Sequence, residues 1–161
     1  MLDKQNLFSD QQAIAGAAGT FVSTNKVQVT AVSPAGGTGA FTTDTLGNTV
    51  ENDPGKSPAV DILITVTEQF AGGDTVSFQV GYDNDAAFGS PTILAQTPAI
   101  AIATLKPGYQ VRLSLPPGRT AADLYMGVQY VTLGAGAMSA GKVTAGIIQH
   151  GGRPTAPGIF V

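Results

Sequence analysis

Few residues of this chain have the chemistry of a catalytic group. His150 is the single histidine and there is no cysteine, so a Ser-His-Asp or Cys-His device has one candidate base and no thiol. His150 stands beside Gly151-Gly152 in a glycine- and proline-rich stretch, which favours a solvated residue over a catalytic one. We find no catalytic signal and expect a protein that is not an enzyme and carries no cofactor.

The sequence Asp83-Asn84-Asp85 has the D-x-D opening of a calcium-binding loop. An EF-hand would continue with a ligand at the fifth position, glycine at the sixth and glutamate at the twelfth. Those positions hold Ala87, Phe88 and Leu94, so the motif fails. Two interpretations remain, an adventitious cation site and a turn in which Asp and Asn bind nearby backbone, and the turn is favoured.

Other carboxylates have no partner that the sequence can identify. Two of them could in principle form an acid/base pair for glycoside hydrolysis. An aromatic content of 7% without tryptophan disfavours a cleft that stacks on sugars. The carboxylates in question are those of Asp3, Asp10, Asp61 and Asp123.

Composition restricts the class of partner. The 161 residues suit one domain, or one domain with arms. Only 12% are charged, the net charge is −3, and no Lys/Arg cluster occurs of the kind that neutralises phosphates, so we expect no nucleic-acid partner. No apolar run is long enough for a membrane helix, so no membrane partner is expected either. The charge-poor surface is either neutral and solvated or covered by other subunits.

The clearest secondary-structure signal lies between Val60 and Tyr82. Two segments with strict apolar–polar alternation flank Gly72-Gly73, which predicts two half-buried strands. Because glycines accept positive φ, we interpret the pair as an antiparallel hairpin. Its inward faces predict four core residues, Ile62, Ile64, Phe78 and Val80.

Alternation and turn signals predict about eight short antiparallel strands and no convincing helix, which is typical of a β-sandwich and, with eight strands in two sheets, of a jelly roll. The Ser9–Gln12 pair fits a capping box but precedes too few helix-forming residues for more than a turn. The expected strands lie within residues 21–32, 60–67, 76–82, 92–96, 99–105, 109–115, 124–130 and 143–147.

Three segments depart from the strand pattern. Residues 1–19 and 151–161 are predicted to be N- and C-terminal arms around a sandwich domain of residues 20–150. Residues 33–58 form a long loop, interpreted as a contact loop, with turn chemistry for a short hairpin near Leu46-Gly47-Asn48-Thr49. The apolar residues at 159–161 either pack on this domain's own surface or insert into a neighbouring subunit.

Several short segments of the sequence are similar to those of a known protein family. The opening Leu2-Asp3-Lys4-Gln5-Asn6-Leu7-Phe8-Ser9-Asp10, the run Tyr82–Pro91, Pro107-Gly108-Tyr109 and Val143-Thr144-Ala145-Gly146 resemble capsid cement (decoration) proteins of tailed bacteriophages. The resemblance is carried by their order and spacing over most of the chain. The loop at 33–58 and the segment after His150 are longer than that family's pattern.

The resemblance implies a jelly-roll subunit on the outer surface of the virion head. Its partners would be the major capsid protein and further copies of itself, as a dimer or trimer. We expect apolar anchors for these contacts on the two arms, at Leu2, Leu7, Phe8, Ile159 and Phe160. The alternative is a jelly-roll module that recognises a receptor or carbohydrate through an aromatic patch, for which Tyr109, Tyr125 and Tyr130 are the candidates.

Overall fold

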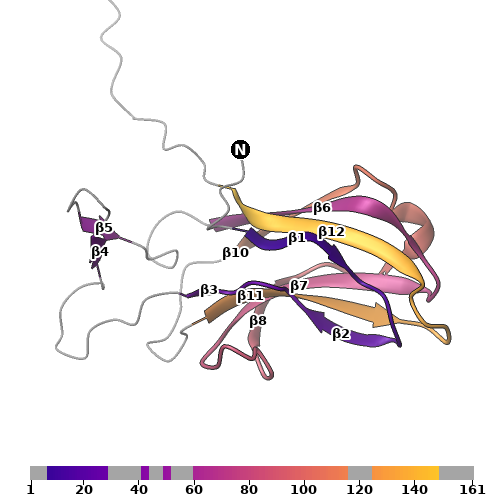
Figure 1. Cartoon of the computed structure of the whole chain (residues 1–161), viewed down its shortest axis with the longest axis horizontal. Coiled ribbons are helices and arrows are strands. Elements are labelled where there is room, and N and C mark those ends of the chain that lie inside the picture. The colour runs from indigo at the N-terminus through magenta and orange to yellow at the C-terminus, as the bar shows by residue number, and fades with distance from the viewer. Residues whose placement is uncertain (1–6, 29–40, 44–48, 52–59, 116–124, 149–161) are drawn as a thin grey trace, which may run out of the picture.

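The computed structural model describes residues 7–28, 41–43, 49–51, 60–115 and 125–148. Most of these residues form two antiparallel sheets packed face to face, with the core between them (Figure 1), and residues 41–43 and 49–51 form a separate two-stranded sheet. The prediction of an all-β sandwich is therefore confirmed. No helix among the described residues is long and apolar enough to span a membrane.

The first sheet has four strands and the second has six. In spatial order, the first sheet contains β1 (Leu7–Ala13), β12 (Ala140–Ile148), β6 (Val60–Ala71) and β10 (Gln110–Leu115). The second contains β2 (Gly19–Val22), β11 (Tyr125–Leu133), β7 (Thr75–Asp83) and β8 (Thr92–Gln96), with β3 (Val27–Gln28) beside β11 and β9 (Ile100–Ala101) beside β7.

The strand order is that of a jelly roll. Of the eight principal strands, the first in the chain pairs with the last (β1 with β12) and the second with the seventh (β2 with β11). The third pairs with the sixth (β6 with β10) and the fourth with the fifth (β7 with β8). This nesting arises when one long antiparallel ribbon, with its turn between β7 and β8, is rolled into two sheets, and it confirms the predicted fold.

The predicted hairpin between β6 and β7 is wrong. β6 pairs with β10 and β12 in the first sheet, whereas β7 pairs with β8, β9 and β11 in the second. Gly72 and Gly73, with φ of 74° and 63°, carry the chain from one sheet to the other. A Cβ on Gly72 would collide with the backbone carbonyl of Ala137, so only glycine fits at this position of the crossing.

The core consists of the inward faces of both sheets. The four predicted core residues are confirmed, each at most 1% exposed. Phe78 meets Tyr130 edge to face, with ring centroids 6.0 Å apart. The alternation therefore identified the buried face of both strands correctly, although it did not identify the strands with which each of them pairs.

The predicted arm over residues 1–19 is wrong from Leu7 onward. Leu7–Ala13 form β1, an edge strand paired with β12 through two register breaks. Ser9 and Gln12 are linked by a side-chain hydrogen bond of 2.6 Å, but they lie on a bulged strand and begin no helix. The sandwich therefore begins at β1, ahead of the predicted boundary at residue 20.

Two other predicted elements have different outcomes. β4 (Phe41–Thr43) pairs with β5 (Thr49–Glu51), which confirms the short hairpin inside the long loop. The strand predicted over residues 99–105 is reduced to β9, followed by the 3₁₀ helix η2 (Ile102–Thr104). The rest of the loop at 33–58 and the segment 151–161 lie outside the described residues.

Candidate functional site

The Asp83–Pro91 loop is a backbone-bonded turn, as the favoured interpretation predicts. Asp83 accepts hydrogen bonds from the backbone N–H of Asp85 at 3.1 Å and of Ser90 at 3.0 Å. The Asp85 carboxylate accepts one from the N–H of Ala87 at 3.0 Å. Both carboxylates thus stabilise the loop itself. Within the described residues, no group of three or more His, Cys, Asp or Glu side chains could hold a metal ion.

The same loop turns a phenylalanine back onto the outer face of the second sheet. Phe88 has a φ of 55° and is completely buried, and its carbonyl accepts a 3.5 Å hydrogen bond from Gln129 Nε2. A Cβ on Gly127 would lie 3.0 Å from the Phe88 ring. Gly127 therefore leaves the space that this ring fills, and the loop is anchored against β11.

Of the remaining acidic candidates, the two in described residues, Asp61 and Asp10, do not form an acid/base pair. Asp61 is only 2% exposed although it lies on the outward side of β6, and it is bound by the Arg112 guanidinium and the Ser114 hydroxyl. Asp10 is exposed on β1. Asp3, Asp123 and His150 lie outside the described part of the chain.

The three tyrosines of the alternative interpretation do not share a surface. Tyr130 is buried in the core, and burial raises the pKa of its hydroxyl group far above the ordinary value. Tyr109 precedes β10 of the first sheet, whereas Tyr125 begins β11 of the second, at the other end of the sandwich. Tyr130 is therefore unavailable to an aromatic binding patch.

Of the five predicted anchors, two are in described residues. Phe8 is completely buried in the sandwich core, so its assignment as a docking anchor is wrong. The bulges in β1 turn both Phe8 and Ser9 inward, a change of direction that regular alternation does not anticipate. Leu7 is partly buried at the start of β1. Leu2, Ile159 and Phe160 are outside the described residues and stay predictions.

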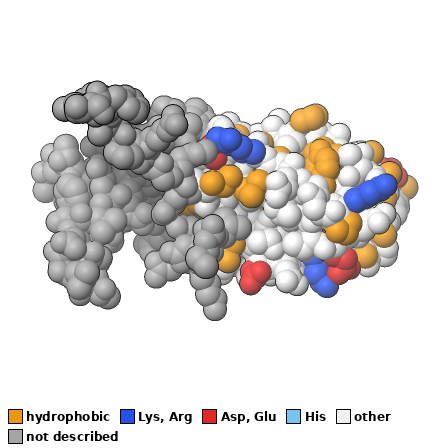
Figure 2. Space-filling view, turned by 90° about the horizontal axis from the view of Figure 1, so that it is seen from above, with side chains coloured by type: hydrophobic (Ala, Val, Ile, Leu, Met, Phe, Trp, Pro, Cys, Tyr) orange, Lys and Arg blue, Asp and Glu red, His pale blue; other side chains and the backbone are white. Residues whose placement is uncertain are grey.

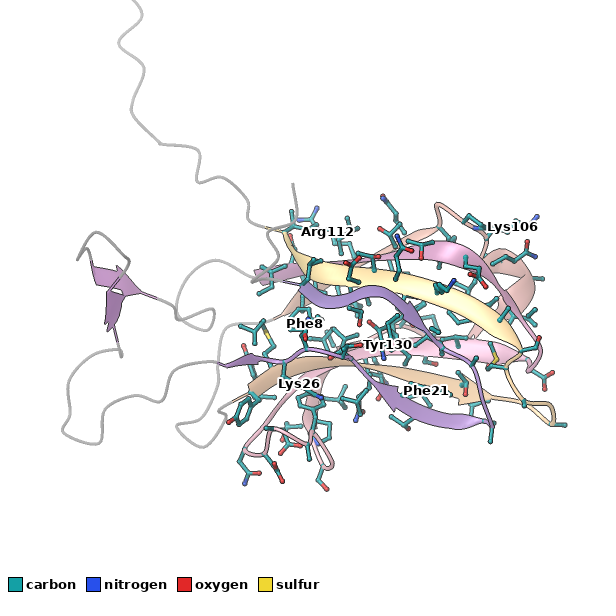
Figure 3. The ribbon with its side chains drawn as sticks, viewed as in Figure 1. Phe8, Phe21, Lys26, Lys106, Arg112 and Tyr130 are labelled. Carbon is teal, nitrogen blue, oxygen red and sulfur yellow. The ribbon has the colours of Figure 1, made fainter. Side chains whose placement is uncertain are left out.

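A hydrogen-bond network joins the two sheets along the β1/β2 side. Gln12 Nε2 donates to the Val22 carbonyl at 2.8 Å, and Gln12 Oε1 accepts from the N–H of Thr24 at 2.8 Å. Ser9 Oγ lies 2.8 Å from the hydroxyl group of Tyr130, a residue that Figure 3 shows between the two sheets. Sequence analysis found Ser9 and Gln12 only as a capping box, because their partners are distant in the chain.

The two ends of the sandwich differ. At one end, which we call the turn end, principal strands that follow one another in the chain are joined by residues 14–18, 72–74, 97–109 and 134–139. The third of these connections includes β9 and η2. At the other, the segment end, β6 starts, β10 ends, β12 ends and β11 starts. β1 starts there as well, since Leu7 is the register partner of Gly146.

Four further segments of the chain are joined to strands at the segment end. Residues 1–6, 29–59, 116–124 and 149–161 are each joined in the sequence to strand ends at the segment end, and these strand ends lie on the left of Figure 1. The Asp83–Pro91 loop joins β7 to β8 at the same end. The anchors Leu2, Ile159 and Phe160 belong to two of these segments.

The outer face of the first sheet has few charges. Figure 2, which looks onto this side of the molecule, shows scattered Lys, Arg, Asp and Glu side chains on a mostly uncharged surface. Lys142 pairs with Glu68 at 2.6 Å, and Arg112 pairs with Asp61. These charges largely neutralise one another across neighbouring strands.

Comparison with known proteins identifies a family. A search of curated proteins finds no match for the chain. The family model Bbp16 matches residues 8–147, which cover all of the jelly roll except the first residue of β1 and the last residue of β12. The match covers most of the 161 residues. The chain therefore belongs to the Bbp16 family.

Proposed function

We propose that this protein is a capsid cement subunit that binds the outer surface of an assembled bacteriophage head and stabilises it by bridging major capsid proteins. The observation that carries the proposal is that residues 1–6, 29–59, 116–124 and 149–161 are all joined to strand ends at the segment end. A jelly roll with several segments joined at one end can rest on a shell by that end and contact several subunits at once.

Two further features support this role. The Tyr82–Pro91 run, which resembles cement proteins, forms the anchored loop at the segment end. The surface charge is low, so close contact with a protein shell requires little desolvation of charged groups. A subunit on the outside of a head has no need for a basic face that binds DNA.

Cement activity follows from mass action. A protein that binds only the assembled lattice stabilises that lattice in proportion to the logarithm of its concentration over its dissociation constant. Several segments that dock together add avidity without a strong individual contact. Contacts through Leu2, Ile159 and Phe160 and association of the subunit as a dimer or trimer would both act in this way.

The test is a binding assay with purified procapsids and heads that lack the protein. We expect saturable co-sedimentation of the full chain with heads, and higher temperatures of head disruption once it is bound. Deletion of residues 154–161 is expected to lower occupancy, while Ala135→Ser at an exposed position of the turn end serves as the control. Binding to a glycan panel without binding to heads would favour the receptor- or carbohydrate-binding alternative.

A further inference from the structure

The loop of residues 83–91 is exposed to solvent and yet tightly held. Its exposed residues are 84–87, Gly89 and Ser90. The carboxylate of Asp83 nevertheless accepts hydrogen bonds from two backbone N–H groups of the loop, and the N–H of Phe88 donates to the carbonyl of Asp85 at 3.0 Å. Surface loops are ordinarily the mobile part of a fold. This loop instead holds a defined shape through its own contacts.

Phe88 anchors the loop at a place outside the core. Its ring is completely buried, but it does not belong to the cluster of core residues between the two sheets. It lies over Gly127 on the outer face of β11, and the register partner of Gly127 on β7 is a second glycine, Gly81. We call the space above these two glycines the notch. Because the ring fills the notch and not the core, it can be removed without opening the core.

The backbone of Phe88 is strained. Its φ of 55° lies in the left-handed region, which is unfavourable for a residue with a bulky side chain. Glycine would relieve the strain but would also remove the ring that holds the loop. Strained residues persist where their surroundings enforce them, and they cluster at binding sites and switches. Since the core does not depend on this ring, the strain points to a role for the shape of the loop itself.

We propose that the tip of this loop, residues 84–87, is a preformed contact of the protein with the outer surface of the head, and that Phe88 positions it. The inference rests on the proposed function, which puts the segment end against the shell. The loop belongs to that end, because Asp83 of β7 is the register partner of Tyr125, the first residue of β11.

The chemistry of the tip suits a recess in a protein surface. None of its side chains is larger than those of Asn84 and Asp85, so the backbone of a partner can approach closely. The carboxylate of Asp85 already accepts a hydrogen bond from the N–H of Ala87. None of residues 83–91 is basic, which disfavours a nucleic acid as the partner. A loop that already has its bound shape loses little conformational entropy on docking, and this raises affinity.

The first test releases the loop and leaves the residues of the tip unchanged. Phe88→Ala removes the ring, and Gly127→Val fills the notch from β11. Each should speed amide hydrogen exchange at the two loop N–H groups that donate to Asp83. Each should also raise the dissociation constant of the full chain from purified heads at least about tenfold, because the loop must then be ordered on binding. Ser77→Val, on the outer face of β7, is the matched control and should change neither quantity.

The second test changes the tip and leaves the anchor in place. Ala86→Glu adds a long charged side chain at the tip, and Ala135→Glu makes the same change at an exposed position of the turn end. Only Ala86→Glu should raise the dissociation constant from heads, by about tenfold or more, and exchange of the loop amides should stay unchanged. A purely structural role of the loop would not produce that result. In the double variant Phe88→Ala/Ala86→Glu the two losses should add less than fully, because both act on one contact.

Equal head binding by the wild-type chain and Ala86→Glu would overturn the inference. Unchanged affinity of Phe88→Ala with a released loop would overturn it as well, and so would loop amides that stay protected without the ring. In all three results the wild-type chain still binds heads, so the proposed function stands. A wild-type chain that does not bind heads would refute the proposed function and this inference with it. If Phe88→Ala does not fold, Gly127→Val and Ala86→Glu decide in its place.

Discussion

Ser9 and Tyr130, on opposite sheets, are joined by a hydrogen bond of 2.8 Å in the core of the sandwich. Ser9 Oγ also donates to Gln12 Oε1 at 2.6 Å, so the hydroxyl proton of Tyr130 is the one that is donated to Ser9. Thr24 donates to the same Gln12 oxygen at 2.8 Å. The resulting chain of hydrogen bonds runs from the centre of β11 through β1 to the end of β2.

We predict that Tyr130→Phe lowers the free energy of unfolding by about 1–2 kcal/mol, because it leaves a buried Ser9 oxygen without its donor. Chemical denaturation of the variant measures this loss. In the Tyr130→Phe background, Ser9→Ala should cost less than it does alone, because the partner is already absent. Equal costs in both backgrounds would show that the two hydroxyl groups are not coupled.

The same tyrosine makes stability depend on alkaline pH. Burial raises the pKa of Tyr130 above its ordinary value, and the hydrogen bond with Ser9 opposes this only in part. The folded state therefore keeps a proton that the unfolded state loses above about pH 10. The contribution of Tyr130 to the free energy of unfolding is therefore fully present below about pH 10. Above that pH it declines by up to about 1.4 kcal/mol per pH unit. Denaturation from pH 8 to 11 should show a shallower decline for Tyr130→Phe, and identical slopes would contradict the account.

The glycine crossing between β6 and β7 predicts a position-specific effect. Gly72→Ala combines a left-handed backbone with a Cβ that collides with the Ala137 carbonyl. Gly108→Ala has the same left-handed strain, at φ +89°, with open space around the Cβ. We expect a loss of about 1–2 kcal/mol for Gly108→Ala and at least about 1 kcal/mol more for Gly72→Ala, measured by thermal unfolding. Equal losses would mean that the crossing tolerates a side chain.

Phe78 should be among the costliest core residues to truncate. It is completely buried and packs edge to face on Tyr130. Phe78→Ala is expected to lower the free energy of unfolding by about 3–5 kcal/mol. Ser77→Ala, on the opposite face of the same strand, is the control and should change it by about 0.5 kcal/mol or less. A loss under about 1 kcal/mol for Phe78→Ala would contradict the assigned core.

The sequence patterns predicted which face of each strand is buried better than they predicted which strands pair with each other. The alternation from Val60 to Tyr82 identified Ile62, Ile64, Phe78 and Val80 as core, because a period of two depends only on which side of a strand is buried. It could not distinguish a hairpin from a crossing between sheets, since Gly72 and Gly73 accept the backbone of either. β6 pairs instead with β10 and β12, which are distant in the sequence, and this pairing places β6 and β7 in different sheets.

The N-terminal strand shows the same limit. The Ala- and Gly-rich residues after Ile14 and the capping-box pair Ser9–Gln12 indicated an arm. The polar side chains instead find partners on β2 and β11, and the apolar Phe8 and Ile14 are buried. For the candidate site, the Asp83–Asp85 turn was predictable because its bonds are local. The position of Phe88 over Gly127 was not, because it depends on contact between distant segments.

The measurement that tests the central claim most directly is a cryo-EM map of purified heads incubated with the full chain. The account predicts jelly-roll density on the outer surface, with the segment end, marked by Val60 and Leu115, against the capsid protein. The turn end, marked by Gly72 and Gly134, should face solvent. Heads that stay bare at saturating protein, or subunits that dock by the turn end, would contradict it.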